Sequence, residues 1–241
     1  VASITEAAHA VGALTIWDTA HSAGALALAL DDWGVDFAVG CSYKFLNAGP
    51  GGPAWIYVGP HLHDSAQNPL AGWFGHAAPF DFSPGWTPAP GAERFRSGTP
   101  AVLSFVGFEE SLLAIEGVDP ALVEAKAGAL TEALLDHLTS AGAFDVGGLF
   151  EATGVELVTP LAAADRGAQV SLRMTHAWPV VRALAERGVI GDHRPPDLVR
   201  LGFAPLVTRF ADASAGAQAL LDILATESWR DARFRPRTVV P

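Results

Sequence analysis

Four side chains capable of acid, base or nucleophilic chemistry lie close together near the start of the chain. Asp18 and His21 follow one short apolar run, and the neighbours Tyr43 and Lys44 follow another. A carboxylate, an imidazole, a phenol and a primary amine can all hold or transfer protons, and the amine can also attack a carbonyl carbon. This set predicts one site that the four residues share.

Lys44 is the most informative of the four, because the chain rarely uses lysine. It has 15 basic residues, and only Lys44 and Lys126 are lysines. A guanidinium cannot form a Schiff base with a carbonyl, whereas a primary amine of tunable pKa can. An aspartate that keeps a pyridinium nitrogen protonated is the usual companion of a lysine that binds pyridoxal phosphate, and Asp18 fits that role. The alternatives are a surface lysine and an aspartate that caps a helix.

Two predicted strands would bring these side chains together. The β-rich run 13–17 ends on Asp18, and the run 36–40 ends shortly before Tyr43 and Lys44. The connection between the runs predicts a strand, a crossover and a parallel strand. Ligands of open α/β sheets bind beyond the carboxyl ends of the strands, so we expect the four side chains to meet there.

Several short motifs occur in a fixed order along the chain. They are WDTAH at 17–21, WGVDFA at 33–38, SYKFLN at 42–47, GWFGH at 72–76, PGAERF at 90–95, GTP at 98–100 and VRLGFAPL at 199–206. This ordered set, which covers nearly the whole chain, resembles one enzyme family, kynureninase. Members of that family are type I pyridoxal phosphate enzymes of the aspartate aminotransferase fold, and they hydrolyse L-kynurenine to anthranilate and L-alanine.

The resemblance assigns the cofactor site residue by residue. It implies that Lys44 forms the Schiff base with pyridoxal 5'-phosphate and that Asp18 pairs with the pyridinium nitrogen. His21 would lie beside the cofactor ring. Tyr43 would contact the cofactor phosphate and take part in proton transfer, and its alternative role is a packed aromatic at a strand end.

Three further residues follow from the same resemblance. Trp73 and Thr99 match residues that bind the phosphate of the neighbouring subunit, and Arg200 matches the residue that grips the substrate α-carboxylate. From the sequence alone, an arginine within a strand needs an anion, and an internal salt bridge is the alternative to substrate. Arg94 and Arg194 are weaker candidates for anion binding.

The implied activity is the hydrolysis of L-kynurenine in tryptophan catabolism, the kynurenine pathway and NAD biosynthesis, by a homodimer with shared active sites. Gly98 stands where some members have serine, which leaves the use of 3-hydroxykynurenine open. The chain starts at Val1, and the resemblance begins in the middle of a kynureninase. We therefore expect an N-terminally truncated fragment that is weakly active or inactive alone.

Three other functions compete with this one. A cysteine desulfurase-like lyase uses a catalytic cysteine well downstream of the lysine, whereas Cys41, the single cysteine, precedes it. A fragment without catalytic activity would still fold or dimerise. A metal-dependent hydrolase would need a third ligand beside Asp18 and His21, and neither this pair nor the His61 and His63 pair has supporting spacing, so we expect no metal.

The composition narrows the classes of partner. The net charge is -11 and no basic run occurs, so we expect no nucleic acid partner. One cysteine argues against a disulfide framework, and no run reads as a signal peptide or membrane span. We expect a cytoplasmic protein that acts on a small molecule and does not bind membranes.

The pattern predicts an α/β fold with two domains. Residues 1–116 would be the C-terminal part of a large PLP-binding domain, with a mostly parallel sheet and helices, and residues 117–241 would form a small α+β domain. In the first we expect a buried strand at 54–58 and a buried helix at 101–115. In the second we expect a helix over 120–141, strands at 155–158, 168–174 and 198–203, and helices at 178–187 and 212–226.

Overall fold

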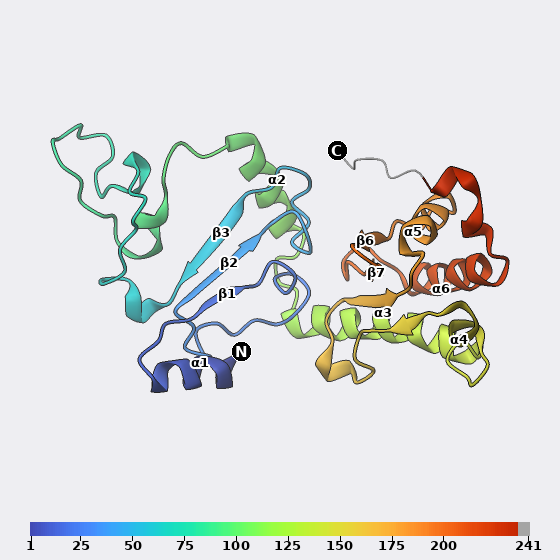
Figure 1. Ribbon diagram of the computed structural model, residues 1–241. Coiled ribbons are helices and arrows are strands. Elements are labelled where there is room, and N and C mark those ends of the chain that lie inside the picture. The colour runs from blue at the N-terminus through green and yellow to red at the C-terminus, as the bar shows by residue number, and fades with distance from the viewer. Residues whose placement is uncertain (236–241) are drawn as a thin grey trace. The chain divides into compact units, whose positions relative to one another are not determined.

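The computed structural model describes residues 1–235 and divides into two units (Figure 1). Unit 1 is Val1–Pro120, and unit 2 begins at Ala121. This division lies close to the boundary proposed after residue 116. No helix of the described residues is long and apolar enough to cross a membrane.

Unit 1 is built on a three-stranded sheet in the order β1-β2-β3. Strand β1 (Ile16–Asp18) pairs in parallel with β2 (Phe37–Cys41), as the sequence predicts, and β2 pairs antiparallel with β3 (Ala54–Val58). The segment between β1 and β2 is a series of turns. The parallel pair is the feature that matters for chemistry, because both strands end at the same edge of the sheet.

The helices of unit 1 are short or exposed. Helix α1 (Ala2–Ala10) precedes the sheet, and α2 (Val102–Leu113) follows the long irregular segment that begins after β3. Three 3₁₀ helices lie within that segment: η1 (Pro60–Leu62), η2 (Trp73–Gly75) and η3 (Gly91–Phe95).

Two expected burials in unit 1 are wrong. No residue of α2 is buried, and in β3 only Val58 is. Both segments are rich in apolar residues, which predicts burial, but burial also requires another element that covers them. Leu103 of α2 is 89% exposed and Ile56 of β3 is 38% exposed.

Unit 2 is a four-stranded antiparallel sheet, in the order β4-β5-β7-β6, packed with helices (Figure 1). The predicted strands and helices are present within a few residues of their expected bounds, and β6 and α4 were not predicted. The elements are α3 (Pro120–Ser140), α4 (Leu149–Thr153), β4 (Glu156–Leu157), η4 (Ala163–Asp165), β5 (Gln169–Arg173), α5 (Ala177–Glu186), β6 (Asp192–Arg194), β7 (Leu198–Gly202), α6 (Phe210–Ala225), η5 (Ser228–Arg230) and η6 (Ala232–Phe234).

The hydrophobic core of unit 2 follows from the two-residue period of its strands. Val170 and Leu172 of β5 and Val199 and Leu201 of β7 point to one face of the sheet and are buried. Side chains of α3, α5 and α6 complete this core. The alternate residues of the same strands therefore form a second, more polar face.

Candidate active site

The parallel strands bring two of the predicted functional segments to one edge of the sheet of unit 1. Asp18 is the last residue of β1 and pairs in register with Val39 of β2. Strand β2 ends at Cys41, so Tyr43 and Lys44 follow directly beyond the same edge. His21 lies in the turn after Asp18 and is exposed.

The two turns that follow these strands pack closely on each other. A Cβ atom on Gly24 would lie 2.5 Å from the backbone carbon of Phe45, so only glycine fits there. The thiol of Cys41 lies 3.9 Å from the carbonyl oxygen of Ala20. The turn that carries Asp18 and His21 is thereby held against the segment that carries Tyr43 and Lys44. Cys41 itself is half-buried.

The reactive groups at this edge are accessible. Lys44 makes no ion pair with any carboxylate of residues 1–235, and its Nζ lies 5.5 Å from the centre of the Tyr43 ring. Tyr43 is 52% exposed. Asp18 is exposed, and its Oδ1 accepts a hydrogen bond from the Ala20 N–H at 2.9 Å. An amine, a phenol and a carboxylate are thus available to a ligand at one edge.

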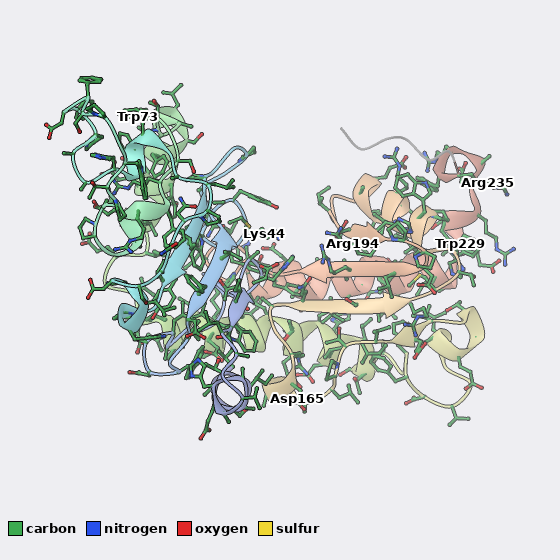
Figure 2. All side chains as sticks on the ribbon, turned by 60° about the vertical axis from the view of Figure 1, so that its left-hand side comes forward. Lys44, Trp73, Asp165, Arg194, Trp229 and Arg235 are labelled. Atoms are coloured by element: carbon green, nitrogen blue, oxygen red, sulfur yellow. The ribbon has the colours of Figure 1, made fainter. Side chains whose placement is uncertain are left out.

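Trp73 and Thr99 lie elsewhere in unit 1. Figure 2 shows Trp73 well apart from Lys44. The segments of Trp73 and Thr99 approach each other, because a Cβ on Gly72 would lie 1.8 Å from the Ser97 carbonyl oxygen. Trp73 is 45% exposed, and its indole N–H donates to no acceptor among the described residues. Thr99 is exposed as well.

Arg200 lies in unit 2, on the polar face of the sheet. It lines a pocket of about 340 Å³ together with Arg194 and Arg166. Arg200 forms an ion pair with Asp192, which is the alternative that the sequence left open, and its side chain is 22% exposed. The guanidinium of Arg166 is occupied by Thr131, Leu161 and Glu132, and burial lowers its pKa.

Asp36, a buried carboxylate that the sequence analysis missed, lies directly before β2, at the end of the sheet opposite to Tyr43 and Lys44. Asp36 accepts hydrogen bonds from His9 at 2.8 Å, His61 at 2.9 Å and the Thr15 backbone N–H at 2.7 Å. Burial acts to raise the pKa of Asp36, but the bonds from His61, His9 and Thr15 outweigh it and hold that pKa well below its usual range. Both histidines of the pair at 61 and 63 make hydrogen bonds within unit 1, since the His63 ring also bonds the Val58 carbonyl oxygen.

Arg94 has a structural role. It is buried, and its guanidinium donates to the carbonyl oxygens of Ala89 at 3.1 Å and Ala66 at 2.7 Å. These bonds tie together the irregular segment between β3 and α2. Among residues 1–235, no three His, Cys, Asp or Glu side chains gather in a way that could hold a metal ion.

Comparisons with known proteins place the sequence motifs in context. The family model described as aminotransferase class-V matches residues 1–159, and the model of the kynureninase C-terminal domain matches residues 123–220. The kynureninase of Deinococcus radiodurans is 47% identical over 92% of this chain and 53% of that protein. The kynureninase of Burkholderia mallei is 42% identical over 99% of this chain and 55% of that protein. The resemblance is confirmed, and the chain spans about half the length of these curated relatives.

Solved structures confirm the α/β fold expected for pyridoxal phosphate-dependent transferases. The cysteine desulfurase of Thermococcus onnurineus NA1 has a TM-score of 0.70 and 19% identity, over 94% of this chain and 56% of that one. An alanine–glyoxylate aminotransferase from Nostoc sp. has a TM-score of 0.63 and 20% identity, over 92% of this chain and 56% of that one. At these identities the likeness describes the fold alone.

Proposed function

Because the chain belongs to the aminotransferase class-V family, we propose that it supplies the lysine-bearing part of an enzyme that hydrolyses L-kynurenine to anthranilate and L-alanine. One observation carries the proposal. In a chain 47% identical to a kynureninase, the parallel pair β1 and β2 brings the segments of Asp18 and Lys44 to the same sheet edge.

The residues at this edge fit pyridoxal 5'-phosphate. The cofactor carries an aldehyde, a pyridine nitrogen and a phosphate. Lys44 offers an amine without a carboxylate partner among residues 1–235, and Asp18 offers an exposed carboxylate for the protonated nitrogen. When bound, pyridoxal phosphate supplies an electron sink that stabilises negative charge at the substrate α-carbon.

The chain's own residues would then move protons and hold the substrate. The Lys44 amine can accept the α-proton, and the Tyr43 phenol can donate one to the carbon that becomes the alanine methyl group. Arg200 would bind the substrate α-carboxylate through its guanidinium. His21 would pack beside the cofactor ring.

The proposal includes a homodimer with shared active sites. Trp73 and Thr99 would bind the cofactor phosphate of the neighbouring subunit, and the separation of Trp73 from Lys44 within one chain supports this assignment (Figure 2). From the resemblance, the proposal also includes a role in the kynurenine pathway and NAD biosynthesis, with 3-hydroxykynurenine as a second possible substrate. A cytoplasmic location is proposed from the single cysteine and from a sequence in which no run reads as a signal peptide or membrane span.

We also propose that these 241 residues have little or no activity alone, since they span about half the length of the curated kynureninases. The test is an absorbance spectrum after pyridoxal phosphate is added, on this chain and on a version extended at its N-terminus to the length of its relatives. The extended protein should show the visible absorbance band of pyridoxal phosphate joined to a lysine, and it should hydrolyse kynurenine.

Two variants make the test specific. Lys44→Ala should abolish the band, and Lys126→Ala, which removes the other lysine, should leave it intact. A band that survives in Lys44→Ala would contradict the assignment of the lysine. Robust turnover by the 241 residues alone would contradict the proposal about the fragment.

A further inference from the structure

On the polar face of the sheet in unit 2, two charged side chains, Asp192 and Arg194, lie beside Arg200. Strands β6 and β7 are antiparallel, and Asp192 stands directly opposite Arg200. Arg194 lies two residues beyond Asp192, so it projects from the same face of β6. Directly opposite residues on one face of an antiparallel pair are the closest side-chain neighbours in a sheet. The register therefore makes Asp192 the cross-strand partner of Arg200.

One carboxylate serves both arginines. Asp192 Oδ2 accepts a hydrogen bond from Arg200 Nη2 and lies 2.9 Å from Arg194 Nε. Asp192 therefore balances one of the two guanidinium charges, and the Asp165 carboxylate, which also lines the pocket beside them, makes no ion pair with a described residue. Within residues 1–235, the bond to Asp192 is the only hydrogen bond of the Arg200 guanidinium, so its remaining N–H groups are available.

Arg200 lines a pocket together with polar side chains of the neighbouring strand β5. Gln169 and Ser171 of β5 alternate with the buried Val170 and Leu172, and Ser171 is the β5 partner of Arg200 in the register. Together with Arg194 and Arg200 they line the pocket of about 340 Å³. The available N–H groups of Arg200 and these polar side chains fit one carboxylate group of a small molecule.

We propose that Asp192 is a positioning residue for substrate recognition. It would fix the guanidinium of Arg200 so that the unused N–H groups meet the α-carboxylate of an amino acid. This inference rests on the proposed function, in which Arg200 binds that carboxylate. A guanidinium held by a charge-assisted bond loses less freedom when it binds a second carboxylate, so the bond favours affinity.

The kinetic test uses the extended, cofactor-loaded protein. Asp192→Ala should raise KM for kynurenine about tenfold with kcat changed less than about threefold, since the lost interaction belongs to binding. Asp192→Glu should recover part of the loss. The preference for kynurenine over its α-carboxamide should shrink in Asp192→Ala, whereas a merely structural defect would weaken both substrates alike. An unchanged or lower KM would overturn the inference.

A matched control separates charge from geometry. Asp165 also lines the pocket and makes no ion pair with a described residue, so Asp165→Asn measures the loss of one negative charge alone. If Asp165→Asn raises KM as much as Asp192→Ala does, the positioning role of Asp192 is wrong, and the change in KM comes from the loss of negative charge in the pocket. Equal melting temperatures of the two variants and the parent would exclude a folding defect.

A second readout needs neither cofactor nor activity. In the 241-residue chain, NMR of the arginine side chains should show slow rotation of the Arg200 guanidinium, and Asp192→Ala should make it fast. Rotation that does not depend on Asp192 would overturn the inference. If rotation responds as expected but the extended protein does not act on kynurenine, the proposed function fails while the positioning contact stands.

Discussion

At the residue scale, each of the two tyrosines of the chain has a distinct environment. Tyr43 is half exposed beside Lys44, at the edge where the proposed chemistry takes place. The hydroxyl of Tyr57 donates to Asp31 Oδ1 at 2.5 Å. Burial raises the pKa of Tyr57 and the bond to Asp31 raises it further, so this phenol keeps its proton throughout the physiological range. Of the two tyrosines, Tyr43 is the one that lies at the edge of the proposed chemistry.

Tyr43→Phe should therefore lower kcat for kynurenine about 100-fold in the extended protein, which is the low end of the usual contribution of a general acid or base. Tyr57→Phe is the matched control, because it removes the same hydroxyl at a site away from the edge, and it should keep kcat within about twofold. Steady-state kinetics of the two variants decide the matter. Equal rates in Tyr43→Phe and the parent would remove Tyr43 from the proposed chemistry.

Asp36 gives a second prediction at this scale. Asp36→Asn should destabilise unit 1 by about 2 kcal/mol, since hydrogen bonds to a charged group contribute about 1.5–3 kcal/mol. The native pKa of Asp36 lies below the unfolded one, so the stabilisation is complete above the unfolded value of about 3.9 and is lost as the pH falls towards the native value.

Urea unfolding at about pH 5 and about pH 3 checks the sign of this effect. The difference between the parent and Asp36→Asn should be smaller at the lower pH. Asp32→Asn, which changes an exposed carboxylate on the same connection, should have little effect at either pH. A difference that grows on acidification would contradict the assigned role of Asp36.

At the element scale, the sequence predicts the bounds of helices and strands better than it predicts which of their residues are buried. Strand β3 matches its prediction residue for residue, and α3 matches within one residue, because hydrophobic periodicity and turn residues are local signals. Gly142 has φ 69°, as expected of a glycine just after a helix. Strand β6 was missed because its three polar residues, DHR, carry no apolar alternation.

In the candidate site, too, some features could be predicted from the sequence and others could not. Residue types and motif order predict the candidate residues, and the parallel pairing of β1 with β2 could be inferred from the connection between the two runs. The contacts of Asp36 with His9 and of Asp192 with Arg200 could not, because each depends on the register or packing of separate elements. The exposure of α2 was unpredictable for the same reason.

That exposure gives a prediction for α2. Leu103→Glu should change the free energy of unfolding of the 241-residue chain by less than about 0.5 kcal/mol, because surface substitutions rarely do more. Leu134→Glu is the control at a buried site in α3, 1% exposed, and should cost about 3 kcal/mol or more, since it buries an unpaired charge. Thermal unfolding of both variants provides the measurement, and a large loss in Leu103→Glu would show that α2 is covered in solution.

At the scale of the whole molecule, the two units differ in how much apolar surface they bury. The continuous hydrophobic core lies entirely in unit 2, where it joins the sheet to α3, α5 and α6. In unit 1 the strands leave apolar side chains in contact with solvent, with Ile16 71% exposed and Val39 37% exposed. Because apolar burial is the main source of stability, unit 2 should be the more stable part of the 241-residue chain.

Hydrogen exchange would measure this difference directly, since protection reports the free energy of local or global opening. The backbone amides of β5 and β7, the strands that carry the buried Val170 and Val199, should exchange more slowly than the backbone amides of β2. The comparison is matched, because all three are central strands with a neighbouring strand on each side. Leu172→Ala should lower the protection of β5 and β7 by about 2–5 kcal/mol, the usual cost of a cavity in a core, and should leave β2 unchanged. Protection of β2 equal to that of β5 would mean that the sheet of unit 1 is stabilised by contacts other than those described, and a response of β2 to Leu172→Ala would mean that the two units unfold as one.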